Sequence, residues 1–142
     1  MTIITLEQLL TELNRDLESE YAAAMRYTRH AATLDGAAFD PIQKELLVHA
    51  QQEMDHAAML SNQIDALGGV PAIKAEPREI PPDTVEMLRQ HLAGENRAIK
   101  RYKERISQAE SLREYGLRRV LEDILIQEEA HKRDLVNALA KT

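Results

Sequence analysis

The chain has 142 residues, enough for one domain with a real core, and its 24 acidic and 18 basic residues give a net charge of −6. This charge argues against broad contact with nucleic acid. The sequence contains no cysteine, which excludes disulfides, iron–sulfur clusters and thiolate metal sites, and no apolar run approaches membrane-spanning length. We therefore expect one cytoplasmic domain over residues 1–142, with no nucleic-acid or membrane partner.

The hydrophobic pattern predicts an all-α protein. Hydrophobic residues make up 44% of the chain and aromatic residues only 4%, a composition typical of long helices rich in alanine and leucine. Apolar residues recur at alternating steps of three and four, which predicts helices over about residues 6–34, 41–67, 83–109 and 112–139. Thr5, Asp40 and Asp83 are expected N-caps, and Pro41 is expected at the first position of the second helix.

The lengths of the connections predict the topology. The first two helices are joined by a short link, as are the last two, so each pair should form an antiparallel hairpin. Residues 68–82 carry four of the five prolines and lack a helical period. A connection of this length is expected to cross over along the bundle, which gives up-down-down-up connectivity. A plain up-down-up-down bundle with a loose middle loop is the alternative.

One spaced pattern of polar residues occurs twice. The pattern Glu-x6-Tyr-x25-Glu-x2-His is formed once by Glu20, Tyr27, Glu53 and His56, and again, with identical spacing, by Glu95, Tyr102, Glu128 and His131. Each of these glutamates and histidines falls on the apolar stripe of its helix, which should face the core. Because a buried carboxylate is costly unless it is paired, protonated or bound to metal, the repeat indicates two hairpins that each supply half of a dinuclear metal site.

The types of ligand residue narrow the choice of metal ion. Within each hairpin the glutamates and histidines should lie at one height, so four carboxylates and two imidazoles would converge in mid-bundle, as in di-iron carboxylate bundles. Oxygen and nitrogen ligands without thiolate favour iron or manganese, with zinc as a competitor. The alternative is a purely structural bundle in which these residues are in phase by coincidence. That bundle would have a very polar core.

The segments that carry this pattern resemble the ferritin-like superfamily, and most closely bacterioferritin, over nearly the whole chain. The matching segments are Ser19-Glu20, Glu53-Met54-Asp55-His56, Glu86 to Glu95, and Glu128-Glu129-Ala130-His131. The chain ends soon after the last of these, so it resembles a short form without bacterioferritin's fifth helix. The expected fold is a ferritin-like four-helix bundle of two antiparallel hairpins joined by a long crossover.

The resemblance implies a ferroxidase, an enzyme that oxidises Fe(II) with dioxygen or peroxide for iron storage or detoxification. It implies a site for two iron ions per chain, held by Glu20, Glu53, His56, Glu95, Glu128 and His131, with Glu53 and Glu128 as bridges. It also implies a homo-oligomer built from dimers, with a cage as one form. The alternatives are a di-iron or di-manganese oxidoreductase, such as a rubrerythrin-like peroxidase, and a non-catalytic metal-binding bundle.

Three residue types in or beside this pattern need an interpretation. Tyr27 and Tyr102 should bond to ligand carboxylates and orient them. By the resemblance, Met54 aligns with the methionine that binds haem between two bacterioferritin subunits, but one methionine on an outward face is more often a packing residue. His49, one turn before Glu53, is either a transient iron site or a satisfied core histidine.

Other residues are expected to serve the surface or the packing. His30 and His91 are expected at the surface or at an interface. Gly94 should allow a neighbouring helix to approach closely, and the basic residues from Arg97 to Arg105 should form a solvated face.

Overall fold

The computed structural model describes residues 3–34, 36 and 39–142, and it confirms the all-α prediction. Four helices carry the described part of the chain, α1 (Leu6–Thr33), α2 (Asp40–Ala66), α3 (Thr84–Ser111) and α4 (Tyr115–Ala140). Each lies within a few residues of its predicted range. No helix that the structure describes is long and apolar enough to cross a bilayer.

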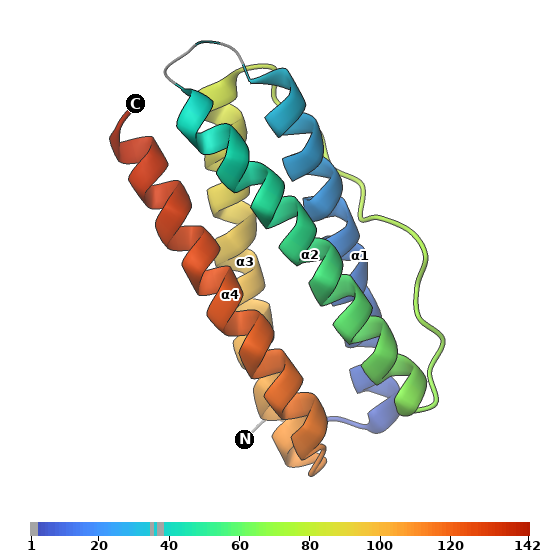
Figure 1. Cartoon of the computed structure of the whole chain (residues 1–142). Helices are drawn as coiled ribbons and strands as arrows, with labels where there is room; N and C mark the ends of the chain where they lie inside the picture. Colours follow the sequence, from blue (N-terminus) through green and yellow to red (C-terminus); the bar gives the residue numbers. More distant parts are fainter. Residues whose placement is uncertain (1–2, 35, 37–38) are drawn as a thin grey trace.

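The helices form a bundle with the predicted crossover. In Figure 1, α1 and α2 run antiparallel, the connection from α2 climbs back along the bundle beside α1, and α3 then runs in the same direction as α2. Helix α4 returns beside α3, so the connectivity is up-down-down-up and the alternative topology is wrong. Helix α1 packs on α2 and α3, and α4 packs on α3 and α2, which leaves α1 opposite α4 across the bundle axis.

Local sequence accounts for the starts of α1 and α3. The Thr5 hydroxyl accepts a hydrogen bond from the Gln8 amide, and the Gln8 side chain accepts one from the Thr5 amide, so the predicted cap of α1 is confirmed as a capping box. The Asp83 side chain caps α3 with one hydrogen bond, which it accepts from the Glu86 amide at 3.0 Å. The predicted cap of α2 is wrong, because Asp40 is already helical and Phe39 precedes the helix without a side-chain cap bond.

The crossover is hydrogen-bonded to α1. The Asn14 side chain donates to the Val70 carbonyl at 3.0 Å and accepts from the Ala72 amide at 2.8 Å. Further along, the Glu76 amide donates to the Glu18 carbonyl at 3.0 Å. These bonds satisfy backbone groups of a segment that has no secondary structure of its own, and they fix its path along one face of the bundle.

The apolar core is divided by a polar layer. One cluster of buried side chains lies toward the α1 N-terminus and includes Leu13, Leu60 and Leu121, and the other lies toward the α1 C-terminus and includes Leu46 and Leu135. Between them lie the glutamates and histidines of the repeat. Packing on both sides therefore holds the polar layer at mid-bundle and keeps water away from it.

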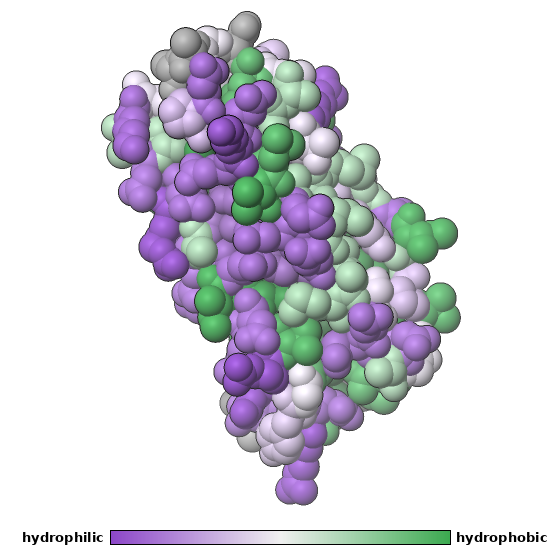
Figure 2. Space-filling view, in the orientation of Figure 1, coloured by the Kyte–Doolittle hydropathy of each residue, from purple (hydrophilic) through white to green (hydrophobic). Residues whose placement is uncertain are grey.

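The surface differs between helices. Figure 2 shows hydrophilic side chains over much of α4, and more hydrophobic and neutral ones over α2 and the crossover. Leu47, Val48 and Met54 on α2 are each about half exposed, and Val70 and Ile73 of the crossover are almost fully exposed. The crossover side of the bundle is therefore the less hydrophilic one in this view.

Two glycines give a matched test of the packing. The expectation that Gly94 admits a neighbouring backbone is wrong, because a Cβ there would meet only the guanidinium ends of Arg26 and Arg97, at 3.6 and 3.7 Å. We expect Gly94→Ala to raise the free energy of unfolding by about 0.5–1 kcal/mol. Gly69→Ala should lower it by about 1 kcal/mol or more, since its Cβ would lie 3.0 Å from side-chain carbons of Ile64 and Leu10. Urea unfolding of both variants checks the two signs.

Candidate metal centre

The structure brings all six predicted ligands together in mid-bundle. Each is at most 3% exposed. Their side-chain ligand atoms form two groups within which all atoms lie less than 4.8 Å apart, one of Glu20, Glu53, His56 and Glu128 and the other of Glu53, Glu95, Glu128 and His131. Glu53 and Glu128 belong to both groups. The arrangement offers two adjacent metal positions that share two carboxylates.

Two glutamines that we did not predict as part of the site orient the histidines. His131 Nε2 donates to the Gln52 side-chain oxygen at 2.6 Å, and His56 Nε2 donates to that of Gln127. These bonds keep the proton on Nε2 and leave Nδ1 of each ring for the centre. Each glutamine directly precedes a ligand glutamate, so the repeat is in fact Gln-Glu-x-x-His, and this signal was present in the sequence.

The Nδ1 atoms face the carboxylates. His56 Nδ1 lies 3.4 Å from Glu20 and 3.3 Å from Glu128, and His131 Nδ1 lies 3.1 Å from Glu95 and 3.2 Å from Glu53. Each imidazole thus points at carboxylate oxygens contributed by both hairpins. A pair of cations seated between these atoms would be contacted by all four helices.

Several ligand atoms have no hydrogen-bond partner in the structure. Buried oxygens of Glu20, Glu53 and Glu128, both of them in Glu128, and Nδ1 of His56 are unpaired. A buried carboxylate oxygen without a partner is strongly destabilising unless a proton or a cation meets it. The unpaired atoms belong to the convergent groups, so the donor set fits divalent cations with oxygen and nitrogen ligands.

The pKa values of the metal-free centre also indicate that its buried carboxylates need protons or cations. Burial, followed by repulsion from neighbouring carboxylates, raises the pKa of Glu20, Glu53 and Glu95. Burial lowers the pKa of His56, but the carboxylates of Glu128 and Glu20, 3.3 and 3.4 Å from its Nδ1, outweigh burial and raise the pKa of the imidazole to about 10. Protons therefore occupy part of the centre when no metal does.

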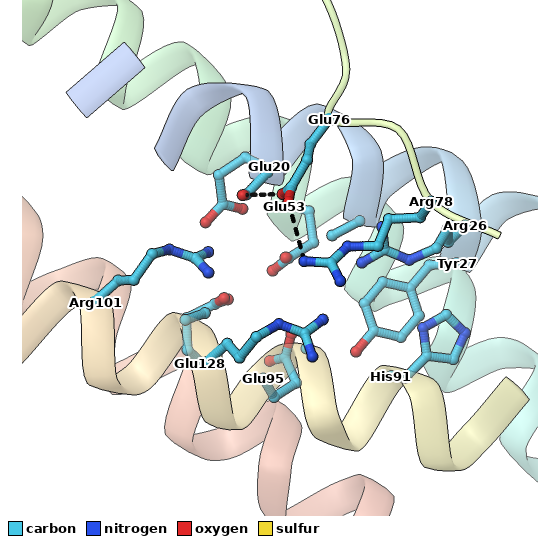
Figure 3. A pocket seen from close by; sticks show the side chains of 15 residues that line it. Glu20, Arg26, Tyr27, Glu53, Glu76, Arg78, His91, Glu95, Arg101 and Glu128 are labelled. Carbon is cyan, nitrogen blue, oxygen red and sulfur yellow. Dashed lines mark hydrogen bonds and ion pairs between the residues drawn. The ribbon is translucent and has the colours of Figure 1, made fainter. Parts of the chain in front are cut away.

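The two tyrosines cross between hairpins. The Tyr102 hydroxyl on α3 donates to Glu20 of α1 at 2.5 Å, so the predicted contact with a ligand carboxylate is present. Its counterpart Tyr27 on α1 points toward Glu95 of α3, although its hydroxyl has no hydrogen-bond partner among the described residues (Figure 3). Each tyrosine therefore faces the glutamate of the other hairpin, and only Tyr102 bonds to it.

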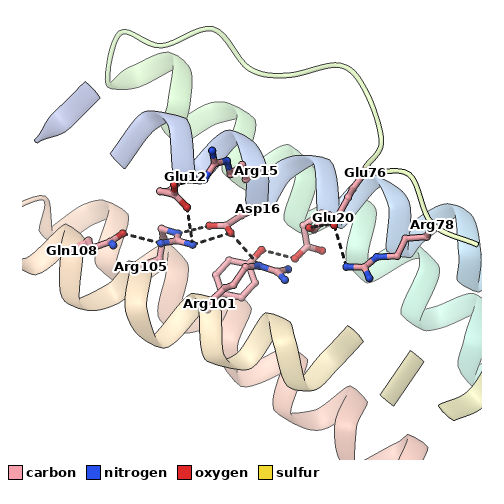
Figure 4. Close-up of polar contacts among 11 residues, drawn as sticks. Glu12, Arg15, Asp16, Glu20, Glu76, Arg78, Arg101, Arg105 and Gln108 are labelled. Carbon is pink, nitrogen blue, oxygen red and sulfur yellow. Dashed lines mark hydrogen bonds and ion pairs between the residues drawn. The ribbon is translucent and has the colours of Figure 1, made fainter. Parts of the chain in front are cut away.

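A buried ion pair lies on one side of the centre. Asp16 is fully buried and accepts from Arg105 Nε at 2.7 Å, and Arg101 lies 3.3 Å from the same carboxylate (Figure 4). The prediction of a solvated basic face over residues 97–105 is thus wrong for Arg105, which is 4% exposed.

A histidine pair occupies the equivalent place on the other side. Each position of the second repeat copy is 75 residues after the first, and by that offset Asp16 corresponds to His91 and Arg105 to His30. His30 Nδ1 and His91 Nε2 lie 3.0 Å apart, and the His91 ring stacks on Tyr27 with ring centroids 4.0 Å apart. The expectation that both histidines are surface or interface residues is wrong, since both are buried.

The remaining predicted residues lie outside the two ligand groups. His49 is buried, contacts Asp134 through Nε2 at 3.0 Å and stacks on His131, but its Nδ1 has no hydrogen-bond partner, so the satisfied-histidine interpretation holds for Nε2 alone. Met54 lies on the outer face of α2, 45% exposed, beside Met25 and Ile73. Its role as a haem ligand stays a prediction, because it needs a second subunit.

Two openings lead toward the centre. One lies between α1 and α3, where the crossover passes, and it reaches Glu20 and Glu95 (Figure 3). The other lies between α2 and α4 and reaches His131 past Gln52 and Asp134. The centre is thus buried but approachable from two opposite faces.

The fold and the centre define the class of protein. A bundle with one glutamate from each of two helices and a Glu-x-x-His from each of the other two is the arrangement of dinuclear carboxylate proteins. The ferritin family model, a ferritin-like domain, matches residues 10–142. The chain therefore belongs to the ferritin family, and the predicted resemblance to the ferritin-like superfamily is confirmed.

Two curated relatives share much of this sequence. The nutrient stress-induced DNA-binding protein of Nostoc sp. is 30% identical over 139 residues, which cover 91% of this chain and 76% of that protein. The bacterioferritin of Brucella melitensis biotype 1 is 28% identical over 125 residues, which cover 87% of this chain and 78% of that protein.

Solved structures share the fold. A ferritin-like diiron-carboxylate protein from Bacillus anthracis superimposes with a TM-score of 0.90 at 32% identity, covering 94% of this chain and 96% of that one. The bacterioferritin-related protein of Bacteroides fragilis, a dodecameric thioferritin, superimposes with a TM-score of 0.88 at 28% identity, covering 96% and 87%.

The buried histidine pair predicts a pH dependence of stability. Burial lowers the pKa of His30 to about 4 and that of His91 well below 6.5. As the pH falls from about 6.5 toward 4, the unfolded chain binds protons that the folded chain refuses, so folding stability falls by up to about 1.4 kcal/mol per pH unit for each histidine.

We therefore expect the metal-free His30→Gln/His91→Gln variant to lose less stability than the wild type over this range. Urea unfolding at about pH 6.5 and about pH 5 gives the two differences. Equal losses in the two proteins would contradict the inferred burial of two neutral imidazoles.

Proposed function

We propose that this protein binds two iron ions at the buried centre and oxidises Fe(II) with dioxygen or peroxide. The observation that carries the proposal is the pair of overlapping ligand groups, with unpaired buried oxygens aimed at shared positions. Two Fe(II) ions side by side can give one electron each to the oxidant. Iron is here the substrate as well as the occupant of the site.

Each residue of the centre has a distinct task in this proposal. Glu53 and Glu128 bridge the two ions, since both belong to both groups. Glu20 and His56 complete one metal position, and Glu95 and His131 complete the other. Because burial raises the pKa of three of the four glutamates, metal binding at neutral pH releases protons to solvent.

The comparisons support iron chemistry and self-assembly. One similar structure is a diiron-carboxylate protein, one similar sequence is a bacterioferritin, and another similar structure is dodecameric. We propose a cytoplasmic homo-oligomer in which the outer face of α2, which exposes Leu47 and Met54, meets a second copy. The protein from Nostoc is named for DNA binding, but we expect none here, because this chain has a net charge of −6.

Aerobic Fe(II) titration of the metal-free protein tests the proposal. We expect fast oxidation with a break at about two Fe(II) per chain, because the centre holds two ions. The Glu53→Ala/Glu128→Ala variant should oxidise Fe(II) no faster than buffer. A matched control is Glu110→Ala/Glu122→Ala, which removes two exposed glutamates that pair with Arg118, and it should behave as the wild type.

The amount of Fe(II) that each chain oxidises distinguishes iron storage from iron detoxification. Oxidation that continues far beyond the break with soluble product indicates storage in a cage, and a stop at the break indicates detoxification without storage. A wild-type rate equal to that of buffer would overturn the ferroxidase proposal. It would leave the peroxidase and the non-catalytic metal-binding bundle as the explanations of the centre.

The glutamines give a separate prediction. Gln127→Leu removes the acceptor that keeps the His56 proton on Nε2, so we expect the affinity for Fe(II) to fall by about 10–100-fold. Anaerobic competition with a chelator measures this affinity. Gln51→Leu is the control, because Gln51 is exposed on α2 and bonds only to Asp55 among the interactions described. An unchanged affinity in Gln127→Leu would contradict the orienting role.

A further inference from the structure

The opening between α1 and α3 is lined by four arginines. Arg26 comes from α1, Arg97 and Arg101 come from α3, and Arg78 comes from the crossover. Figure 3 shows the guanidinium groups of Arg26, Arg78 and Arg101 directed into the space above the buried glutamates. Three separate segments of the chain thus place positive charge around one entrance.

Several nitrogens of these guanidinium groups lack a hydrogen-bond acceptor. Nε and Nη1 of Arg26, Nε of Arg97 and Nε of Arg101 are buried from solvent and make no hydrogen bond in the structure. No ion pair within 4.0 Å joins any of the four arginines to Glu20, Glu53, Glu95 or Glu128 in the part of the chain that the structure describes. The metal-binding carboxylates therefore do not satisfy the donors of the opening.

The other acidic groups nearby do not balance the charge. Glu76 pairs with Arg78 at 3.1 Å and accepts from Ser19 at 2.6 Å. Asp16 lies 3.3 Å from Arg101, but it is already held at 2.7 Å by Arg105. Two cations bound at the centre would offset the four carboxylates beneath, and the opening would then keep an excess of positive charge.

The arginines converge on the floor of the opening. Gly94 of α3 has no side chain, and a Cβ there would lie 3.6 Å from Nη2 of Arg26 and 3.7 Å from Nη2 of Arg97. Burial, followed by the charge of Arg78, lowers the pKa of Arg26. Donors that repel one another and lack acceptors are the usual protein environment for an oxyanion.

We propose that the opening between α1 and α3 binds a small oxyanion such as inorganic phosphate, held by Arg26, Arg97, Arg78 and Arg101. The bound anion lies between solvent and the carboxylates of the centre. This side of the bundle then admits anions, and metal cations are expected to enter through the opposite opening between α2 and α4. The proposal goes beyond Fe(II) oxidation and does not depend on it.

Calorimetric titration with inorganic phosphate tests this site without iron or dioxygen. The full-length protein is titrated metal-free and, separately, loaded with redox-inert Zn(II) from which free metal has been removed. We expect one phosphate per chain, and binding weaker by about tenfold or more in Arg26→Gln and in Arg97→Gln, since each loses a charged donor. Arg119→Gln is the matched control, because its side chain is 79% exposed on α4, and it should bind as the wild type.

The outcomes separate this proposal from the proposed function. Absence of saturable binding in both metal states would overturn the oxyanion site. Binding that requires Zn(II) but is equal in all the arginine variants would also overturn it, because phosphate would then be a ligand of the metal. Arg26→Lys keeps the charge and loses the planar fork, so it should bind phosphate more weakly than the wild type and more tightly than Arg26→Gln. None of these results depends on whether the centre oxidises Fe(II).

Discussion

The structure depends on four carboxylates that are buried at one level of the bundle. Charges placed in a dry core are costly unless a counter-charge meets them, and here Glu53 and Glu128 each lie in both candidate metal positions. In the metal-free chain, protons bound to side chains of the centre reduce this cost, in agreement with the raised pKa of Glu53 and of His56. Bound cations would replace those protons. The apolar clusters on both sides then confine the charge to one layer.

The two repeat copies build a centre that is symmetric in its ligands and asymmetric around them. Tyr102 bonds to the glutamate of the other hairpin, and each Gln-Glu-x-x-His segment lends its glutamine to the histidine of the other. The hairpins are therefore interlocked by polar contacts as well as by packing. Beyond the ligands, the tyrosines and the glutamines, the two repeat copies differ. Asp16 and Arg105 form an ion pair on one side of the centre, and His30 and His91 occupy the equivalent positions on the other side. Burial lowers the pKa of both histidines, whereas it raises the pKa of Asp16, so the two sides respond to pH in different ways.

The crossover contributes to the chemistry of the surface as well as to the topology. Its hydrogen bonds to Asn14, Glu18 and Ser19 hold it on α1, beside the gap between α1 and α3. It thereby adds Arg78 and Glu76 to an opening that the four helices alone would leave with three arginines. The opening between α2 and α4 has no such cover, and its charged lining residues are Lys44, Glu45 and Asp134. Two entrances with different linings lead to one buried centre, because an asymmetric connection runs along a symmetric core.

The sequence by itself determined the helices, their pairing and the six residues that meet at the centre, because helical periodicity and repeat spacing are local properties that survive folding. It also carried the glutamine before each ligand glutamate, a signal that the four-point pattern omitted. Tertiary structure alone decided which side chains meet across hairpins. His30 and His91 were expected to be peripheral because they lie away from the level of the repeat, and Arg105 because it belongs to a run of basic residues. All three are buried where α1 packs on α3. The arginine-lined opening was also decided by the tertiary structure alone, because it requires the crossover to lie over α1. No spacing of residues along the chain predicts where the crossover lies.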